Sequence, residues 1–132
     1  MPDEQKLVLN KQAALELCDD EELFLEIVVA YLEDTIEHSR QLLFALEAGD
    51  AHEVEERAHA IKGASANICA GPVREAALQL ERAGRNKDLS QTPQLYKVFK
   101  KEFQRLLEYL KSLPCLYKVV ILFPWKNRLC PL

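Results

Sequence analysis

The stretch from Val54 to Ile68, VEERAHAIKGASANI, decides the fold because apolar and small residues that can pack between helices recur in it at intervals of four and three. The residues on this repeat are Val54, Ala58, Ile61, Ser65 and Ile68. This spacing lines up side chains in one narrow seam along a helix, which is typical of a bundle helix. We therefore expect a helix that packs this seam against other helices.

The neighbouring residues indicate where this helix begins and ends. Upstream, the sequence AGD at 48–50 is typical of a C-cap glycine followed by an aspartate that caps the next helix. Downstream, we expect the helix to run to about Cys69 or Ala70. Gly71-Pro72 would end it and start a further helix, because proline suits a first turn.

Other segments also show helical periodicity. A short helix is predicted at 7–18, and a long helix of about seven turns follows, with Asp19 or Asp20 as its cap, and ends before Gly49. Its apolar-face residues are Phe24, Val28, Tyr31, Thr35, Leu42 and Leu46. Two more helices are predicted from Pro72 to about residue 84–86 and from Thr92 to Leu113. Their inward residues are predicted to be Val73, Ala76, Ala77, Leu80 and Ala83, then Leu95, Val98, Phe99, Leu106 and Leu110.

The connections between these helices are short, so consecutive helices should be antiparallel. No segment before residue 113 alternates with the period of a strand. The sequence predicts an all-α protein, an up-down-up-down four-helix bundle with a short N-terminal helix. We assign residues 1–112 to this single domain and treat 113–132 as an extra C-terminal tail.

The composition changes after Pro114. All 21 acidic residues of the chain precede residue 113, whereas the tail carries three basic residues and an apolar run from Val119 to Phe123. The run is far too short to span a bilayer, and as an exposed strand it would be an aggregation hazard. The alternatives for this tail are an extended strand, an interface segment or a segment foreign to the natural domain. We expect it to pack on the bundle, or on a second copy to give a homodimer.

Charge and cysteine content narrow the function classes. The acidic body argues against a nucleic-acid partner. The four cysteines form no C-x-x-C pair and fit no zinc site, which favours free thiols in a reducing cytoplasm. The charged N-terminus has no apolar core of an export signal, and no glycine-rich phosphate loop indicates ATP binding.

His59 begins a stripe that carries chemistry. Lys62, Gly63 and Ala66 follow it at three, four and seven residues, so all four share one side of the helix. An exposed imidazole is largely neutral at pH 7 and can act as a nucleophile. A phosphoryl group on it would bring roughly two negative charges, which Lys62 could offset. A mid-helix glycine destabilises the helix by up to ~1 kcal/mol, which makes sense if another protein approaches there.

Structural explanations exist for the same residues. Gly63 could allow close helix packing, and His59 with Lys62 could form a solvated face. His38 and His52 are expected to be surface residues. Glu56 with His59 forms an E-x-x-H pair, but a di-iron bundle needs two such pairs. An inert buried thiol is expected for Cys69.

Two stretches, AHAIKGASANICA and REAALQLERAGR, resemble the signature of histidine phosphotransfer (HPt) domains of multistep two-component phosphorelays. His59, Lys62 and Gly63 match the family's His-x-x-Lys-Gly motif, and Ala66 and ALQLE at 77–81 match the residues after it. The likeness covers about residues 10–111. Cys69 stands where the family has a later glycine, and the tail has no counterpart in the family pattern.

The resemblance implies a phosphocarrier that is not an enzyme and binds no cofactor or metal itself. His59 would accept a phosphoryl group from an aspartate on a receiver domain, which supplies Mg²⁺, and pass it to a second receiver. Lys62 would stabilise the phosphoryl charge. The partners would be response-regulator receivers or a hybrid sensor histidine kinase. The expected docking surface comprises Gly63, Ala66, Asn67, Glu55 and Glu56. The alternative function is a non-phosphorylated helical docking module for a signalling partner.

Overall fold

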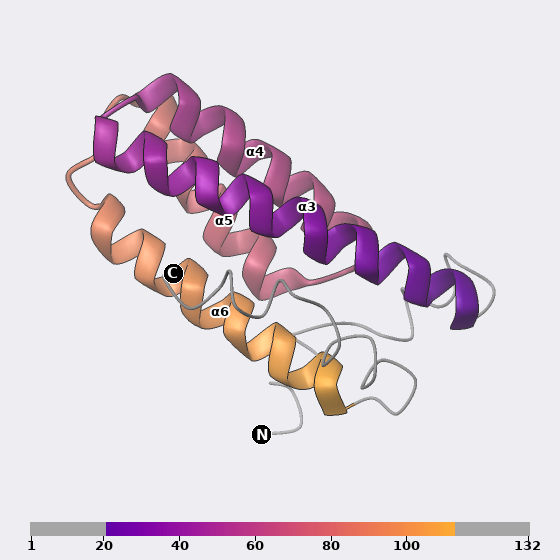
Figure 1. The fold of residues 1–132 in the computed structure, drawn as a ribbon. Helices are drawn as coiled ribbons and strands as arrows, with labels where there is room; N and C mark the ends of the chain where they lie inside the picture. Colours follow the sequence, from indigo (N-terminus) through magenta and orange to yellow (C-terminus); the bar gives the residue numbers. More distant parts are fainter. Residues whose placement is uncertain (1–20, 113–132) are drawn as a thin grey trace.

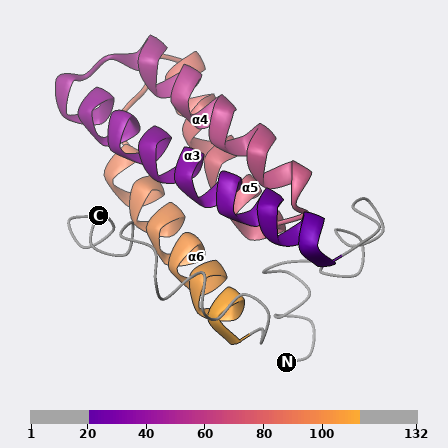
Figure 2. The same ribbon diagram turned by 45° about the vertical axis from the view of Figure 1, so that its right-hand side comes forward.

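Four antiparallel helices run through the part of the chain that the structure, a computed structural model, describes, residues 21–112. They are α3 (Glu21–Ala48), α4 (Ala51–Asn67), α5 (Gly71–Arg85) and α6 (Thr92–Ser112). Consecutive helices run in opposite directions and lie side by side in both views (Figures 1 and 2). The all-α, up-down-up-down prediction is confirmed. The helix predicted at 7–18 and the tail at 113–132 lie outside the described residues.

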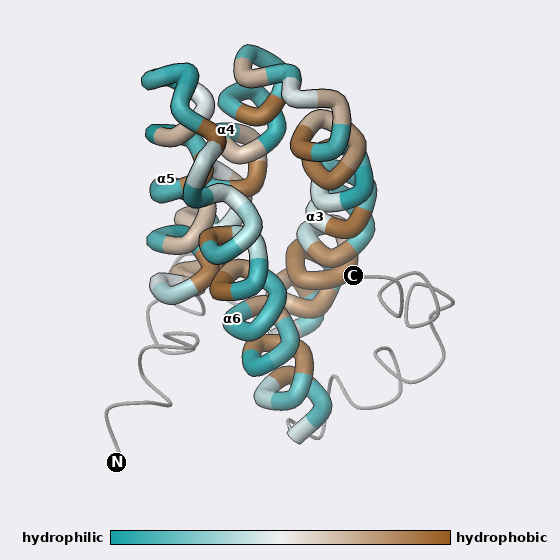
Figure 3. Tube along the Cα trace, turned by 90° about the vertical axis from the view of Figure 1, so that its left-hand side faces the viewer, coloured by the Kyte–Doolittle hydropathy of each residue, from teal (hydrophilic) through white to brown (hydrophobic). Residues whose placement is uncertain are grey.

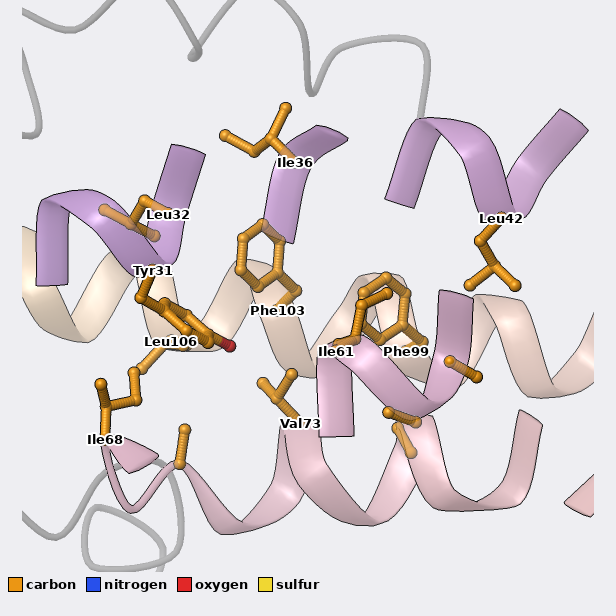
Figure 4. Close-up of a cluster of buried hydrophobic side chains, with 14 of the residues drawn as sticks. Tyr31, Leu32, Ile36, Leu42, Ile61, Ile68, Val73, Phe99, Phe103 and Leu106 are labelled. Carbon is orange, nitrogen blue, oxygen red and sulfur yellow. The ribbon is translucent and has the colours of Figure 1, made fainter. Parts of the chain in front are cut away.

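Each helix directs one apolar face inward, because hydrophobic and hydrophilic residues alternate along it with helical periodicity (Figure 3). The whole predicted seam of α4 is buried, with Ile68 just beyond the helix end. Aromatic rings fill the centre, where Phe103 of α6 stacks on Phe99 and also meets Tyr31 of α3 (Figure 4). The Tyr31 hydroxyl lies 2.8 Å from the Ser65 hydroxyl, so both buried oxygens are paired.

Two predicted core positions are wrong. Val98 is 45% exposed, and Ala83 is half-buried but does not pack against the core, unlike Leu46 and Leu95, which are half-buried and do. The buried face of α6 instead includes Tyr96 and Phe103, and that of α5 includes Glu81. Because successive residues of a helix are rotated by about 100°, Val98 turns away from the core when its neighbour Phe99 points into it.

The ends of α4 are set by local hydrogen bonds. Asp50 caps the start as predicted, with its carboxylate accepting from the Glu53 N–H at 3.1 Å. The helix ends at Asn67, two to three residues before the predicted end at Cys69 or Ala70, because Cys69 adopts a left-handed φ of 60°. The N–H groups of Cys69 and Ala70 then donate back to earlier carbonyls of the helix, which is the hydrogen-bond pattern of a Schellman motif.

Helices α4 and α5 approach closely at Gly84. A Cβ atom at this position would lie 2.6 Å from the Glu55 nitrogen and 2.7 Å from the Ala51 oxygen. The absence of a side chain at residue 84 therefore lets the two backbones touch. This contact places two polar residues of α5, Glu81 and Arg85, beside α4.

None of the helices within residues 21–112 is both long and apolar enough to cross a membrane.

Candidate functional site

The His59 side chain projects from the middle of α4 and is 65% exposed. Its position beside the buried seam residue Ala58 rotates it out of the core, as the spacing predicted. One edge of the ring is nevertheless held, because Nδ1 lies 2.7 Å from Oε2 of Glu81 on α5. The imidazole is thus anchored at one nitrogen and open to solvent on the rest of the ring.

The contact with Glu81 fixes the tautomer of the neutral histidine. An ionised carboxylate only accepts hydrogen bonds, so Nδ1 must carry the proton of the neutral ring and donate a hydrogen bond to Glu81. The lone pair of the neutral ring then sits on Nε2. This arrangement presents a nucleophilic nitrogen to any partner that reaches the exposed side of α4.

Glu81 is itself almost fully buried, with 1% of its side chain exposed. The Lys62 ammonium lies 2.7 Å from Oε1, and the Arg85 guanidinium lies 3.1 Å from Oε2. Burial alone would raise the pKa of this carboxyl. Hydrogen bonds and positive charge from Lys62 and His59 outweigh that effect and hold the pKa of Glu81 below its usual value. Glu81 therefore stays ionised beside the imidazole.

Arg85 bridges two carboxylates across the helix pair. Its Nη2 reaches Glu81, while its Nε donates to Oε2 of Glu55 at 3.0 Å. Since Arg85 and His59 share the same oxygen of Glu81, the guanidinium is a close neighbour of the imidazole. The site thus holds two cations, Lys62 and Arg85, around one exposed histidine.

The surface beyond His59 is open. Gly63 is exposed, and a Cβ atom built there would have no neighbouring atom within 4 Å, so this glycine does not serve helix packing. Ala66 and Asn67, the next residues of the predicted docking surface, are also exposed. Gly63 and Ala66 therefore add little side-chain bulk to the face of α4 that carries His59.

The two glutamates predicted for docking differ in environment. Glu55 faces α5, where it pairs with Arg85, whereas Glu56 is 58% exposed and lies 4.0 Å from Nε2 of the exposed His52. The solvated position predicted for His38 is wrong in part, because its half-buried ring lies 3.3 Å from an Arg57 nitrogen. Within residues 21–112, no group of three metal-ligating side chains comes together.

Sequence reasoning missed Glu81 and Arg85 as members of this site. Glu81 did carry a signal, since it lies four residues after Ala77 on the apolar face of α5. A lone carboxylate on a buried face needs cationic or hydrogen-bonding partners from a facing helix. Periodicity alone could not show that those partners are His59 and Lys62.

The fold and this histidine site together define a histidine-bearing helical bundle. Residues 24–111 match the family described as the Hpt domain, and the chain belongs to that family. The resemblance seen in the sequence is thereby confirmed. Membership makes it a phosphocarrier module of phosphorelays and implies interaction with the receiver domains of other relay proteins.

One solved structure gives a closer view of this likeness. The fold is similar to the crystal structure of histidine-containing phosphotransfer protein B (HptB) from Pseudomonas aeruginosa PAO1, with a TM-score of 0.71 and 28% sequence identity. The similarity covers 75% of this chain and 87% of that chain. No curated protein shows a match to the chain.

Proposed function

We propose that this chain is a phosphorelay intermediate in which His59 accepts a phosphoryl group from a receiver-domain aspartate and passes it to another receiver. The contact between Nδ1 of His59 and the buried Glu81 carries this proposal. It orients the ring and leaves Nε2 as the reacting atom on an otherwise exposed side chain.

The phosphoryl transfer to His59 needs no general base, because no proton has to be removed from Nε2. The Nε2 lone pair forms a bond to phosphorus while the phosphorus–oxygen bond of the aspartyl phosphate breaks, and the aspartate leaves as a carboxylate. The Nδ1 proton stays where it is, so the product ring is a phosphorylated imidazolium. Glu81 stabilises this new positive charge, and it needs no rearrangement to do so because it already accepts the Nδ1 hydrogen bond.

The incoming phosphoryl oxygens meet positive charge on the same face. The ion pair with Glu81 occupies one side of the Lys62 ammonium, which has three N–H donors. Its remaining N–H groups can turn toward the phosphoryl group, and Arg85 can do so by releasing Glu55. Positioning and charge compensation are most of what phosphoryl transfer requires of a protein.

The donor and acceptor receivers would supply Mg²⁺ and the acidic pocket around their aspartate. A receiver would dock along Gly63, Ala66 and Asn67, where the absence of large side chains leaves the way to His59 open. Glu56 lies one turn before the histidine and would contact the edge of such a partner. The reverse transfer to a second receiver uses the same surface.

The test is incubation of the chain with a phosphorylated receiver and Mg²⁺, followed by measurement of acid-labile phosphate on the chain. His59→Gln should take up none. His52→Gln is the matched control, since His52 is an exposed histidine on the same helix, and this variant should behave like wild type. If His59→Gln still binds receivers and wild type takes up no phosphate, the chain is a docking module instead.

A further inference from the structure

A stripe on the first half of α3 carries charged side chains that pair with none of the described residues. It forms a shallow depression lined by Glu22, Leu25, Glu26, Val29, Ala30 and Glu33. Leu25 and Val29 are half-buried and Ala30 is exposed, so the stripe has an apolar floor. The three glutamates along it are exposed, and none forms an ion pair within residues 21–112.

The electrostatic environment of this stripe is strongly one-sided. Residues 21–39 contain six carboxylates and no lysine or arginine. An apolar strip bordered by uncompensated carboxylates fits a segment that combines apolar side chains with positive charge and lacks negative charge. That description excludes most of this acidic chain.

We propose that residues 114–132 of this same chain bind along the stripe on α3. The segment carries the apolar run Val119–Phe123, the basic residues Lys118, Lys126 and Arg128, and no acidic residue. The segment before α3 fits less well, because residues 1–20 contain five carboxylates and only two lysines. Charge thus selects the C-terminal segment over the N-terminal one.

The geometry of the bundle agrees. The end of α6 at Ser112 and the start of α3 at Glu21 lie at the same end of the bundle (Figure 1). Contact between the rings of Tyr31 and Phe103, with centroids 6.4 Å apart, shows that α3 and α6 are neighbours. Six residues after Ser112 can span about 20 Å when extended, which is sufficient to pass around one helix.

The lengths also match. From Glu22 to Glu33 the helix rises about 17 Å, and five extended residues cover about 16 Å. An extended Val119–Phe123 would therefore lie over Leu25, Val29 and Ala30. Lys118 precedes this run directly and Lys126 follows it by three residues, so each could reach a glutamate at an end of the stripe.

Trp125 is the only tryptophan of the chain and reports on this segment directly. In the full chain its fluorescence emission should be blue-shifted and its quenching by acrylamide weak. The double variant Glu26→Lys/Glu33→Lys should shift the emission to the red and increase quenching several-fold. Glu47→Lys/Glu75→Lys makes the same charge change at exposed positions outside the stripe and should leave Trp125 shielded.

A charge swap and the solution mass complete the test. Adding Lys118→Glu/Lys126→Glu to the stripe variant should restore the shielding, and the chain should remain a monomer throughout. Trp125 that is already exposed in wild type, or that responds equally to both charge reversals, overturns the proposal. The proposal is also overturned if the chain forms a dimer and Trp125 loses its shielding when dilution dissociates that dimer. The segment on the stripe would then come from a second copy.

Discussion

The imidazole of His59 and the carboxylate of Glu81 meet across the interface between α4 and α5, with Nδ1 2.7 Å from Oε2. The two residues are 22 positions apart and belong to different helices. The reactivity proposed for His59 therefore depends on the packing of α5 against α4.

Replacing Glu81 with glutamine keeps an acceptor for the Nδ1 proton but removes the negative charge. Since the product imidazolium loses its counter-charge, the initial rate of phosphate uptake from a phosphorylated receiver should fall about tenfold, equivalent to ~1.4 kcal/mol in the barrier. Far-UV circular dichroism checks that the helices remain. An unchanged rate would show that only the hydrogen bond matters.

Acid should destabilise the bundle through Glu81. The pKa of this carboxyl is below its usual value of 4.5 in the folded chain, so the stabilisation is complete above the unfolded value and is lost as pH falls through the folded one. Urea unfolding measured at decreasing pH should show this loss in wild type and a shallower one in Glu81→Gln. Hydrogen bonds from Ser90 also lower the pKa of Asp88, but this effect is common to both proteins, so an equal acid slope would contradict the prediction.

Lys62 should act on the phosphoryl charge, since its ammonium lies beside the ring and keeps donors free. Lys62→Ala should slow phosphate uptake by about tenfold to a hundredfold, while Lys62→Arg retains the charge and should recover most of the rate. Rapid-quench measurement of labelled phosphate on the chain gives both numbers. If the two variants are equally slow, the role of Lys62 is positional and not electrostatic.

Gly63 and Gly84 should respond in opposite ways to alanine. Gly63→Ala meets open space and should stabilise α4 by up to ~1 kcal/mol, yet slow transfer because the new methyl group stands where a receiver approaches. Gly84→Ala places a methyl group against the backbone of Glu55 and should destabilise the bundle by about 1–3 kcal/mol. Thermal unfolding and phosphate uptake, measured on both variants, separate these roles. Equal loss of stability in the two variants would contradict the assignment.

Replacing Cys69 with glycine should stabilise the fold. Its φ of 60° is a conformation that costs a non-glycine residue roughly 1–2 kcal/mol, so Cys69→Gly should raise the free energy of unfolding by up to ~1 kcal/mol after the greater entropy of glycine in the unfolded chain is counted. Cys69→Ala removes the thiol without relieving the backbone and should give no such gain. Denaturant unfolding of the two variants decides between a backbone effect and a thiol effect.

Much of the bundle could be predicted because it depends on local spacing. The 4-3-4-3 seam of α4 and the placement of His59, Lys62, Gly63 and Ala66 on one side of the helix follow from the rotation per residue. The Asp50 cap follows from the preference of aspartate for the N-cap position. Val98 shows where this reasoning fails. Both Val98 and Phe99 are apolar, and only packing against the other helices determines which of them is buried.

The part of the site on α4 was predictable from the sequence, whereas the part contributed by α5 was not. Spacing placed Lys62 beside His59, but Glu81 and Arg85 join them through the register between α4 and α5, which the close contact at Gly84 sets. Likewise, the ring of His38 is partly covered because Arg57 of the next helix reaches it. Such pairings depend on tertiary geometry, for which periodicity holds no information.

The 65% exposure of His59 has a consequence for the direction of signalling. The donor and acceptor receivers would both react at the exposed Nε2 of His59. By microscopic reversibility, Lys62 and Glu81 would accelerate phosphorylation of His59 and its reverse by the same factor. The chain would therefore speed equilibration in both senses without favouring either. Which way phosphate flows would then be decided by the relative stability of the acyl phosphates on its two receivers.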